Sequence, residues 1–284
     1  MTGKGVSSRH GLRFKAFMTA LITGASGGIG EVFARKLAAR GENVVLVARS
    51  EDKLAAICEE LRGAHKVDAQ FVALDLIERD APARLFAETE RRGLVVDMLV
   101  NNAGYGSVGE FALLDLENEL EMIDLNVRAL VELTHRYLQG MRERRAGSII
   151  NVASTTSFQP VPFMATYAAT KAFVLSFSEA LWEENRAWGV RVMALCPGST
   201  ETNFFKVAGT ETPPRNITQT PEAVVETALA ALARGKGHVI SGWGNFLMAE
   251  AVRFAPRALV TRIAGMVLRK RYMPEDVKAV NRES

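Results

Sequence analysis

Apolar runs rich in Val, Ile and Leu alternate with amphipathic helical patterns from residue 17 to residue 241. Strands that are apolar at nearly every position are buried on both faces, and strands that alternate with helices run parallel. The pattern therefore predicts an α/β fold with a doubly wound parallel sheet. The predicted strands are 16–23, 44–48, 70–74, 98–101, 148–154, 191–196 and 238–241, and the predicted helices are 29–40, 51–61, 82–91, 115–143, 165–188 and 221–234.

Composition excludes several other classes of protein. The 284 residues are 48% hydrophobic and 24% charged, which is typical of a globular chain and argues against disorder or a coiled coil. Two cysteines, Cys58 and Cys196, are too few for a disulfide scaffold and fit a reducing compartment. No apolar run has the length of a membrane span, and residues 1–15 lack the apolar core of a secretory signal. We therefore expect a cytoplasmic protein.

Positive charge is concentrated at the two ends of the chain. Residues 1–15 carry four Lys or Arg and no acid, and residues 246–284 carry eight Lys or Arg against four acids. Because the whole chain has a net charge of +3, the section between these two ends, residues 16–245, has a negative net charge. Nucleic-acid enzymes are usually basic across their body, so no nucleic-acid partner is expected. The four histidines are scattered without ligand spacing, so no metal site is expected either.

A glycine-rich turn, Thr23-Gly-Ala-Ser-Gly-Gly-Ile-Gly30, follows the first predicted strand and opens the first predicted helix. Glycines allow a tight turn and a close approach of backbone to ligand. The N-terminus of the helix offers N–H groups and a partial positive charge, which suit a pyrophosphate. The turn therefore predicts a dinucleotide site, the alternative being a glycine-rich turn without a ligand. Its residues with predicted contacts are Gly24, Ser26, Gly28, Ile29 and Gly30.

The end of the second predicted strand, Ala48-Arg49, favours one cofactor over another. NAD-specific sites usually place an acid there for the ribose 2′-hydroxyl, whereas an Arg accommodates the 2′-phosphate of NADP. No acid stands at either position, and the guanidinium of Arg49 can pair with a phosphate. This predicts NADP(H), the alternative being a solvated Arg that begins the following helix.

Tyr167 and Lys171 are four residues apart, so on a helix their side chains share one face. Tyrosine titrates near pH 10, and a neighbouring ammonium lowers its pKa. Tyr167 could then exchange a proton with the oxygen of an alcohol or carbonyl while hydride moves to or from a nicotinamide ring. The alternative is an exposed helical pair without a function.

Several motifs in order resemble the short-chain dehydrogenase/reductase family over about residues 16–241. They are the glycine turn, Asn101-Asn-Ala-Gly104, Asn126, Ser154 thirteen residues before Tyr167, Lys171 and Pro197-Gly198. The resemblance implies a seven-stranded parallel sheet. It also implies a dinucleotide-binding and catalytic domain over residues 16–245, between a basic N-terminal tail (1–15) and a C-terminal helical extension (246–284).

The resemblance also implies a role for each matching position. Tyr167 would be the acid–base, Lys171 would hold the nicotinamide ribose and lower the pKa of Tyr167, and Ser154 would orient the reacting oxygen. Asn126 would fix a water that links Lys171 to solvent. The remaining cofactor contacts would be Asp75 at the adenine, Asn102 and Gly104 in the cleft, Pro197 and Gly198 beside the nicotinamide, and Thr202 at its carboxamide.

Three irregular stretches, 105–114, 155–164 and 199–220, should surround the substrate. Apolar residues in or beside them predict a lipophilic carbonyl or alcohol. They are Phe111, Leu113, Leu114, Phe158, Val161, Phe163, Met164, Phe204 and Phe205.

The extension after residue 245 departs from the family's usual ending. Leu259, Val260, Ile263, Met266 and Val267 form one helical face, and Pro256 predicts a break between two short helices. Three interpretations remain open: packing over the substrate site, contact with a partner subunit, or a basic amphipathic helix on an anionic membrane. A homodimer through helices 115–143 and 165–188 is compatible with the extension, whereas the family's homotetramer contact through the final strand is put in doubt by it.

Together these patterns predict an NADP(H)-dependent oxidoreductase that interconverts a carbonyl and an alcohol of a small lipophilic molecule. The alternatives are an epimerase or dehydratase that holds its cofactor permanently, and a non-catalytic sensor of NADPH.

Overall fold

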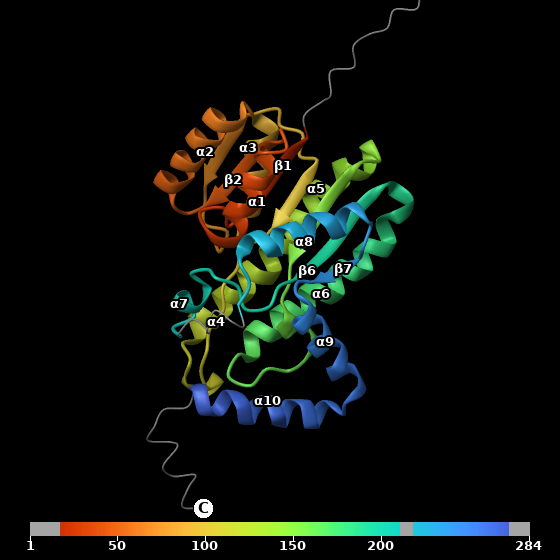
Figure 1. The fold of residues 1–284 in the computed structure, drawn as a ribbon. Coiled ribbons are helices and arrows are strands. Elements are labelled where there is room, and N and C mark those ends of the chain that lie inside the picture. Colours follow the sequence, from red (N-terminus) through yellow and green to blue (C-terminus); the bar gives the residue numbers. More distant parts are fainter. Residues whose placement is uncertain (1–17, 211–217, 273–284) are drawn as a thin grey trace, which may run out of the picture.

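The computed structural model describes residues 18–210 and 218–272, and within them a single seven-stranded sheet forms the centre of the molecule (Figure 1). Every pair of neighbouring strands is parallel, and the strand order is β3-β2-β1-β4-β5-β6-β7. The strands are β1 (Thr19–Thr23), β2 (Asn43–Ala48), β3 (Ala69–Ala73), β4 (Met98–Asn101), β5 (Gly147–Val152), β6 (Val190–Cys196) and β7 (His238–Ile240). The predicted doubly wound parallel sheet is confirmed.

Helices cover both faces of the sheet because its strands are apolar on both sides. One face packs against α1 (Gly28–Ala38), α2 (Glu51–His65) and α8 (Pro221–Ala233). The other packs against α3 (Ala81–Arg91), α5 (Leu130–Arg144) and α6 (Ala165–Asn185). Each core is built on large side chains that are fully buried, such as Phe33 on the first face and Leu99 on the second.

The strand order reverses between β1 and β4, which lie side by side although they are far apart in sequence. In a doubly wound sheet the crevice for a ligand opens where the order reverses, beyond the carboxyl ends of the strands. The glycine turn follows β1, and Asn101 ends β4. The topology therefore brings the turn and the Asn101–Gly104 motif to the same crevice.

The predicted helix 115–143 is continuous, but a π-helical turn interrupts its α-helical hydrogen bonding. It consists of α4 (Leu116–Ile123), a π-helical turn (Asp124–Ala129) and α5. A π turn inserts an extra residue into the helix, and such turns frequently occur at functional sites. Hydrophobic periodicity does not reveal the turn, because the apolar face continues on both sides of it. Asn126 lies inside the turn and is buried.

The C-terminal segment forms two helices, α9 (Trp243–Ala251) and α10 (Arg257–Tyr272), with a short 3₁₀ turn (Val252–Phe254) between them. Pro256 stands before α10, as the predicted break requires. The predicted domain boundary at residue 245 falls inside α9, because the helix starts directly after β7. The predicted basic tail, residues 1–15, lies outside the described residues. None of the helices described is long and apolar enough to cross a membrane.

Candidate active site

A cavity of about 900 Å³ opens at the carboxyl ends of the strands and brings most of the predicted site residues together. It reaches from the glycine turn to the first half of α6 and on to α9 and α10. The predicted residues that line it are Gly24, Ser26, Gly28, Ile29, Asn102, Gly104, Ser154, Tyr167, Lys171, Pro197, Gly198 and Thr202. Gly30, Arg49, Asp75 and Asn126 do not line it, for reasons that differ from one residue to the next.

Gly30 lies beneath the turn rather than at its surface. A Cβ atom added there would lie 2.4 Å from the carbonyl oxygen of Gly24 and 2.6 Å from Nδ2 of Asn102. Gly24 has a φ of +65°, which side chains rarely adopt, and its own Cβ would meet Asn102 at 2.8 Å. Gly30 therefore permits the close approach of α1 to the turn, and its predicted contact with the cofactor stays a prediction.

The side-chain amide of Asn102 joins the turn to the end of β4. Its Nδ2 donates to the carbonyl oxygen of Thr23 at 2.9 Å and to that of Gly24 at 3.3 Å. In return, the hydroxyl of Thr23 accepts the backbone N–H groups of Asn102 and Ala103. These bonds hold the turn open toward the cavity.

The N-terminus of α1 borders the cavity without a side-chain cap. The capping position is Gly27, which lines the cavity together with Ser26, Gly28 and Ile29. The first N–H groups of a helix that lacks a cap, together with the helix dipole, suit a phosphate. The geometry of the turn therefore fits the pyrophosphate of a dinucleotide.

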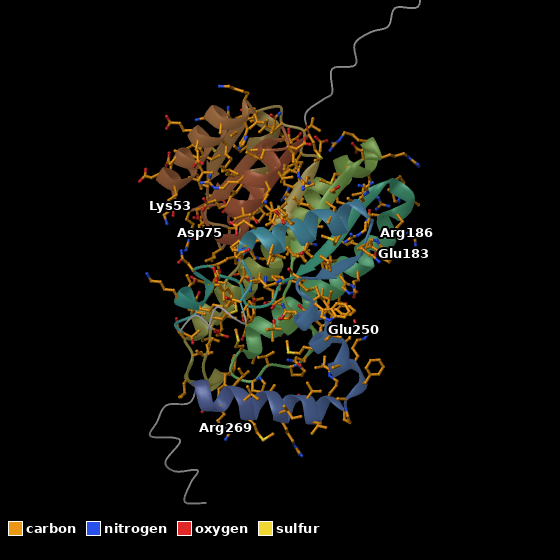
Figure 2. The ribbon with its side chains drawn as sticks, viewed as in Figure 1. Lys53, Asp75, Glu183, Arg186, Glu250 and Arg269 are labelled. Atoms are coloured by element: carbon orange, nitrogen blue, oxygen red, sulfur yellow. The ribbon has the colours of Figure 1, made fainter. Side chains whose placement is uncertain are left out.

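Arg49 and Asp75 lie at the rim of this crevice and face each other. The Nη1 atom of Arg49 is 3.7 Å from Oδ2 of Asp75, and the Arg49 side chain is 73% exposed. Lys53 of α2, four residues after Arg49 and labelled in Figure 2, lines the cavity itself. The sequence alone did not indicate Lys53, because a lysine in the first turn of a surface helix carries no signal of its own.

Tyr167 and Lys171 lie on α6 as predicted, but both side chains are buried. The ammonium of Lys171 donates to the carbonyl oxygen of Val152 at 2.7 Å and lies 5.8 Å from the centre of the Tyr167 ring. The ring of Phe204 packs on the phenol with a centroid distance of 5.2 Å. The alternative of an exposed helical pair is therefore wrong.

Burial dominates the pKa values of this pair. It raises the pKa of Tyr167 to about 12, and a hydrogen bond with Ser154 opposes the rise. Burial also lowers the pKa of Lys171 to about 8. Removal from water raises the pKa of the phenol, and the group that opposes the rise is Ser154. The predicted lowering of this pKa by Lys171 stays a prediction.

Ser154 ends the segment after β5 and begins a short 3₁₀ turn (Thr155–Phe158). Its Oγ accepts the N–H of Thr156 at 3.1 Å, and its own N–H donates to Oγ of Ser157 at 3.3 Å. The Ser157 hydroxyl donates in turn to the carbonyl oxygen of Lys171 at 2.8 Å. Ser157 thus ties the turn that carries Ser154 to the helix that carries Lys171, a role that the sequence did not indicate.

Asn126 holds the backbone of the segment that follows β4. Its Nδ2 donates to the carbonyl oxygen of Tyr105 at 2.9 Å and to Oγ1 of Thr170 at 3.1 Å, and its Oδ1 accepts the N–H of Tyr105. A Cβ at Gly104 would lie 2.7 Å from that Oδ1 and 3.5 Å from the ammonium of Lys171. Asn126 therefore fixes the backbone at Gly104 and Tyr105, next to the ammonium of Lys171. The water that Asn126 was predicted to hold between Lys171 and solvent stays a prediction.

Pro197, Gly198 and Thr202 follow β6 and line the cavity, and Thr202 lies next to Gly28 of the glycine turn. A Cβ at Gly198 would lie 2.4 Å from Nδ2 of Asn245, which α9 places over this loop. That Nδ2 donates to the carbonyl oxygen of Ser241 at 2.7 Å. The extension therefore packs directly on a predicted nicotinamide-binding loop.

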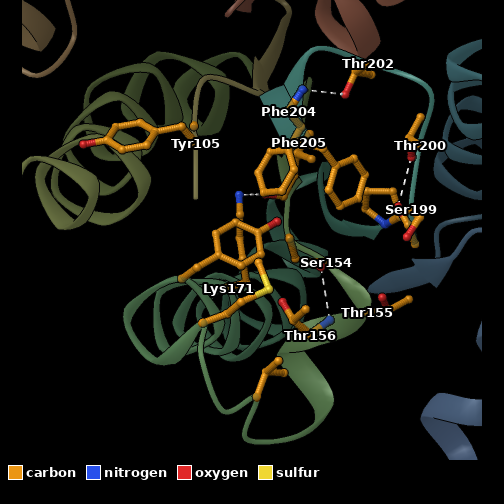
Figure 3. A pocket seen from close by; sticks show the side chains of 18 of the residues that line it. Tyr105, Ser154, Thr155, Thr156, Lys171, Ser199, Thr200, Thr202, Phe204 and Phe205 are labelled. Atoms are coloured by element: carbon orange, nitrogen blue, oxygen red, sulfur yellow. Dashed lines mark hydrogen bonds between the residues drawn. The ribbon is translucent and has the colours of Figure 1, made fainter. Parts of the chain in front are cut away.

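The far part of the cavity is apolar, and much of its wall comes from the C-terminal helices. Figure 3 shows Phe204 and Phe205 of α7 (Phe204–Val207) on the side opposite Ser154 and Thr156. The apolar lining consists of Val161, Met164, Phe204, Phe205, Val207, Met248, Val252, Val260, Ile263, Val267 and Leu268. Of the predicted apolar residues, Phe111, Leu113, Leu114, Phe158 and Phe163 are not part of it. Among the three interpretations of the extension, packing over the cavity is therefore confirmed.

No cluster of three or more His, Cys, Asp or Glu side chains that could hold a metal ion occurs in residues 18–210 and 218–272.

Comparison with known proteins identifies the family. A family model described as short chain dehydrogenase matches residues 18–212. The chain belongs to the short-chain dehydrogenase/reductase family. A very-long-chain 3-oxoacyl-CoA reductase of Macaca fascicularis is 36% identical over 234 residues, which are 79% of this chain and 73% of the relative.

Solved structures of the family are similar in fold as well. A short-chain dehydrogenase from Sphingobium yanoikuyae in complex with NADPH is 31% identical with a TM-score of 0.78, covering 86% of this chain and 95% of its own. A 7β-hydroxysteroid dehydrogenase structure is 30% identical with a TM-score of 0.80, covering 87% of this chain and 96% of its own. The family's dinucleotide and acid–base motifs thus occupy one cavity here.

The close approach at the glycine turn generates the first prediction. In this short-chain dehydrogenase/reductase, Gly30→Ala should lower the free energy of unfolding by about 1–3 kcal/mol, because the added methyl group overlaps the backbone of Gly24. Gly27→Ala is the matched control, because nothing lies within 4 Å of its Cβ. Denaturant unfolding of the two variants measures the difference, and equal stabilities would contradict the assigned packing.

Proposed function

We propose that this chain is an NADP(H)-dependent oxidoreductase that interconverts a carbonyl and an alcohol on a large apolar molecule. The observation that carries the proposal is one continuous cavity that joins the glycine turn, Tyr167 and an apolar wall. A dinucleotide seated at the turn would extend toward α6 along the edge of the sheet, as doubly wound folds bind it.

The residues present fit the cofactor. The uncapped N-terminus of α1 would hold the pyrophosphate, and Lys171 would reach the ribose of the nicotinamide half. Arg49 and Lys53 would face the 2′-phosphate, since both are cationic and no acid stands at the end of β2. The structural neighbour from Sphingobium yanoikuyae, which is in complex with NADPH, supports the choice of NADP(H).

When bound, the reduced nicotinamide supplies the hydride. The Tyr167 hydroxyl donates its proton to the carbonyl oxygen as charge develops there, and in the reverse direction the phenolate accepts it. The hydroxyl of Ser154 donates a hydrogen bond to the same oxygen and orients it. A pKa of about 12 keeps Tyr167 protonated before reaction, which suits a general acid in the reductive direction. The ammonium of Lys171 would stabilise the phenolate that forms.

The apolar wall supports a substrate with a large hydrocarbon skeleton. Side chains from α7, α9 and α10 enclose this part of the cavity, and few polar groups interrupt them. Relatives named for a very-long-chain 3-oxoacyl-CoA and for a 7β-hydroxysteroid act on molecules of that kind.

We also propose a homodimer through the predicted helices 115–143, which is now α4, the π turn and α5, and 165–188, which contains α6. Exposed apolar side chains on α4 and α6, including Leu116, Leu120 and Phe173, support such a contact. The cytoplasmic location remains a prediction.

Replacing the proposed acid tests the reaction. Tyr167→Phe should lower turnover about 100- to 10,000-fold, because proton donation is lost, while NADPH still binds. Turnover is measured as NADPH oxidation with a panel of bulky ketones, and binding as the change in NADPH fluorescence. Tyr137→Phe is the matched control, because that buried tyrosine bonds to Thr89 away from the cavity. Full activity of the Tyr167 variant would refute the assignment, and turnover without net NADPH oxidation would favour an epimerase or dehydratase.

The lowered pKa of Lys171 predicts a pH dependence. Below pH 8 the side chain is an ammonium that can hold the ribose and support Tyr167, and above its pKa of about 8 that charge is lost. The ratio kcat/KM for NADPH should therefore be constant below about pH 8 and then fall, approaching about tenfold per pH unit. Circular dichroism at each pH shows whether the fold persists. A profile that stays level up to about pH 10 would contradict a need for the charged form.

The cofactor preference generates a third test. Arg49→Ala should raise the Kd for NADPH about tenfold, roughly 1.4 kcal/mol, and leave the Kd for NADH nearly unchanged, because only NADPH carries the 2′-phosphate. Lys53→Ala should act in the same direction. Arg40→Ala, an exposed cation beyond α1, is the control. Equal effects on both cofactors would count against the proposed phosphate site.

A further inference from the structure

The two C-terminal helices expose large apolar side chains on the surface that faces away from the cavity. Phe254 is 89% exposed, Trp243 73% and Met266 62%. Leu247 and Leu259 are about half exposed. Soluble chains seldom expose so many large apolar groups together unless the surface contacts something. We call the exposed side of α9, the 3₁₀ turn and α10 (residues 243–272) the C-terminal face.

One side of α10 lines the cavity, and the other side faces solvent. Val260, Ala264 and Leu268 line the cavity, and Ile263 and Val267, which are 47% and 65% exposed, lie at its edge and line it as well. Leu259 and Met266, which lie next to these positions in the sequence, do not line it and point into solvent. The packing of the helix on the enzyme therefore explains its inner side and leaves the outer side without a role.

Positive charge surrounds the exposed apolar groups. Residues 243–269 carry four Arg and one acid, Glu250. Glu250 pairs with Arg253 at 3.2 Å. Arg257, Arg262 and Arg269 are exposed and form no ion pair within the part of the chain that the structure describes. Unpaired cations beside an apolar stripe are typical of a helix that lies on an anionic membrane.

The position of the C-terminal face suits such a contact. Figure 1 shows α10 along one end of the molecule, opposite α2 and α3, and Figure 2 shows Arg269 at that end. A flat surface could therefore approach α10 without covering the crevice at Arg49 and Lys53. Two copies of the chain that met through this face would bring like charges together, which is unfavourable. Charge complementarity therefore favours an anionic surface over a second copy.

We propose that the C-terminal face docks on the surface of a bilayer that contains anionic phospholipids. Leu259, Met266 and Phe254 would enter the boundary between headgroups and acyl chains, and Arg262 and Arg269 would contact lipid phosphates. The wall of the cavity formed by α10 would then lie next to the hydrocarbon. The docking itself does not depend on which substrate the enzyme reduces.

Vesicle sedimentation of the full chain tests the proposal. The protein should sediment with vesicles of phosphatidylcholine that contain about one third phosphatidylglycerol, and much less with phosphatidylcholine alone. High salt should weaken the binding by screening the charges. The double variants Leu259→Asp/Met266→Asp and Arg262→Glu/Arg269→Glu should each lower the partition coefficient at least about tenfold. The first removes two apolar groups from the membrane contact, and the second replaces two lipid-facing cations by acids.

Matched controls lie elsewhere on the surface. Val95→Asp changes an exposed apolar residue at the other end of the fold, and Arg234→Glu/Lys236→Glu reverses two exposed cations after α8. Both controls should bind vesicles like the unmodified chain, and all variants should keep their circular dichroism and NADPH affinity. Failure of the chain to bind anionic vesicles, or equal binding by every variant, would overturn the proposal. A dimer that Leu259→Asp/Met266→Asp dissociates in sedimentation velocity, without vesicle binding, would assign the face to a second copy instead.

Discussion

The close approach of α1 to the ends of β1 and β4 is the constraint on which the rest of the site depends. Three backbone segments meet where an added Cβ at Gly24 or Gly30 would overlap neighbouring atoms. The amide of Asn102 joins them by hydrogen bonds to Thr23 and Gly24. Because the turn cannot move away from the sheet, the N-terminus of α1 stays open toward the cavity. A phosphate can then bind to backbone groups that need no rearrangement.

The acid–base pair depends on a second set of contacts, which spans elements distant in sequence. Ser157 connects the turn of Ser154 to α6, Val152 accepts the ammonium of Lys171, and Asn126 fixes the segment in front of it. These bonds place two ionisable side chains in a nearly dry environment. Burial then sets their pKa values in opposite directions, which leaves Tyr167 protonated and Lys171 close to its titration point. The chemistry proposed for the site follows from that environment as much as from the residue types.

The C-terminal helices link the active site to the molecular surface. Their inner side completes the apolar wall, and Asn245 packs on Gly198 in the loop after β6. Their outer side combines exposed apolar groups with cations that have no acidic partner in the described parts of the chain. One short segment can thus shape the cavity and present a surface for another contact, because an α-helix separates its residues onto opposite sides.

The sequence by itself determined the doubly wound parallel sheet, the glycine turn and the positions of Tyr167 and Lys171, because these follow from local patterns: apolar periodicity, turn chemistry and helical spacing. It also placed the break before α10 at Pro256. Only the tertiary structure decided that burial raises the pKa of Tyr167, that Arg49 faces Asp75 while Lys53 lines the cavity, and that Asn126 lies in a π-helical turn. These features depend on contacts between residues far apart in the chain and on the amount of water excluded around each group. No local pattern of residues contains that information.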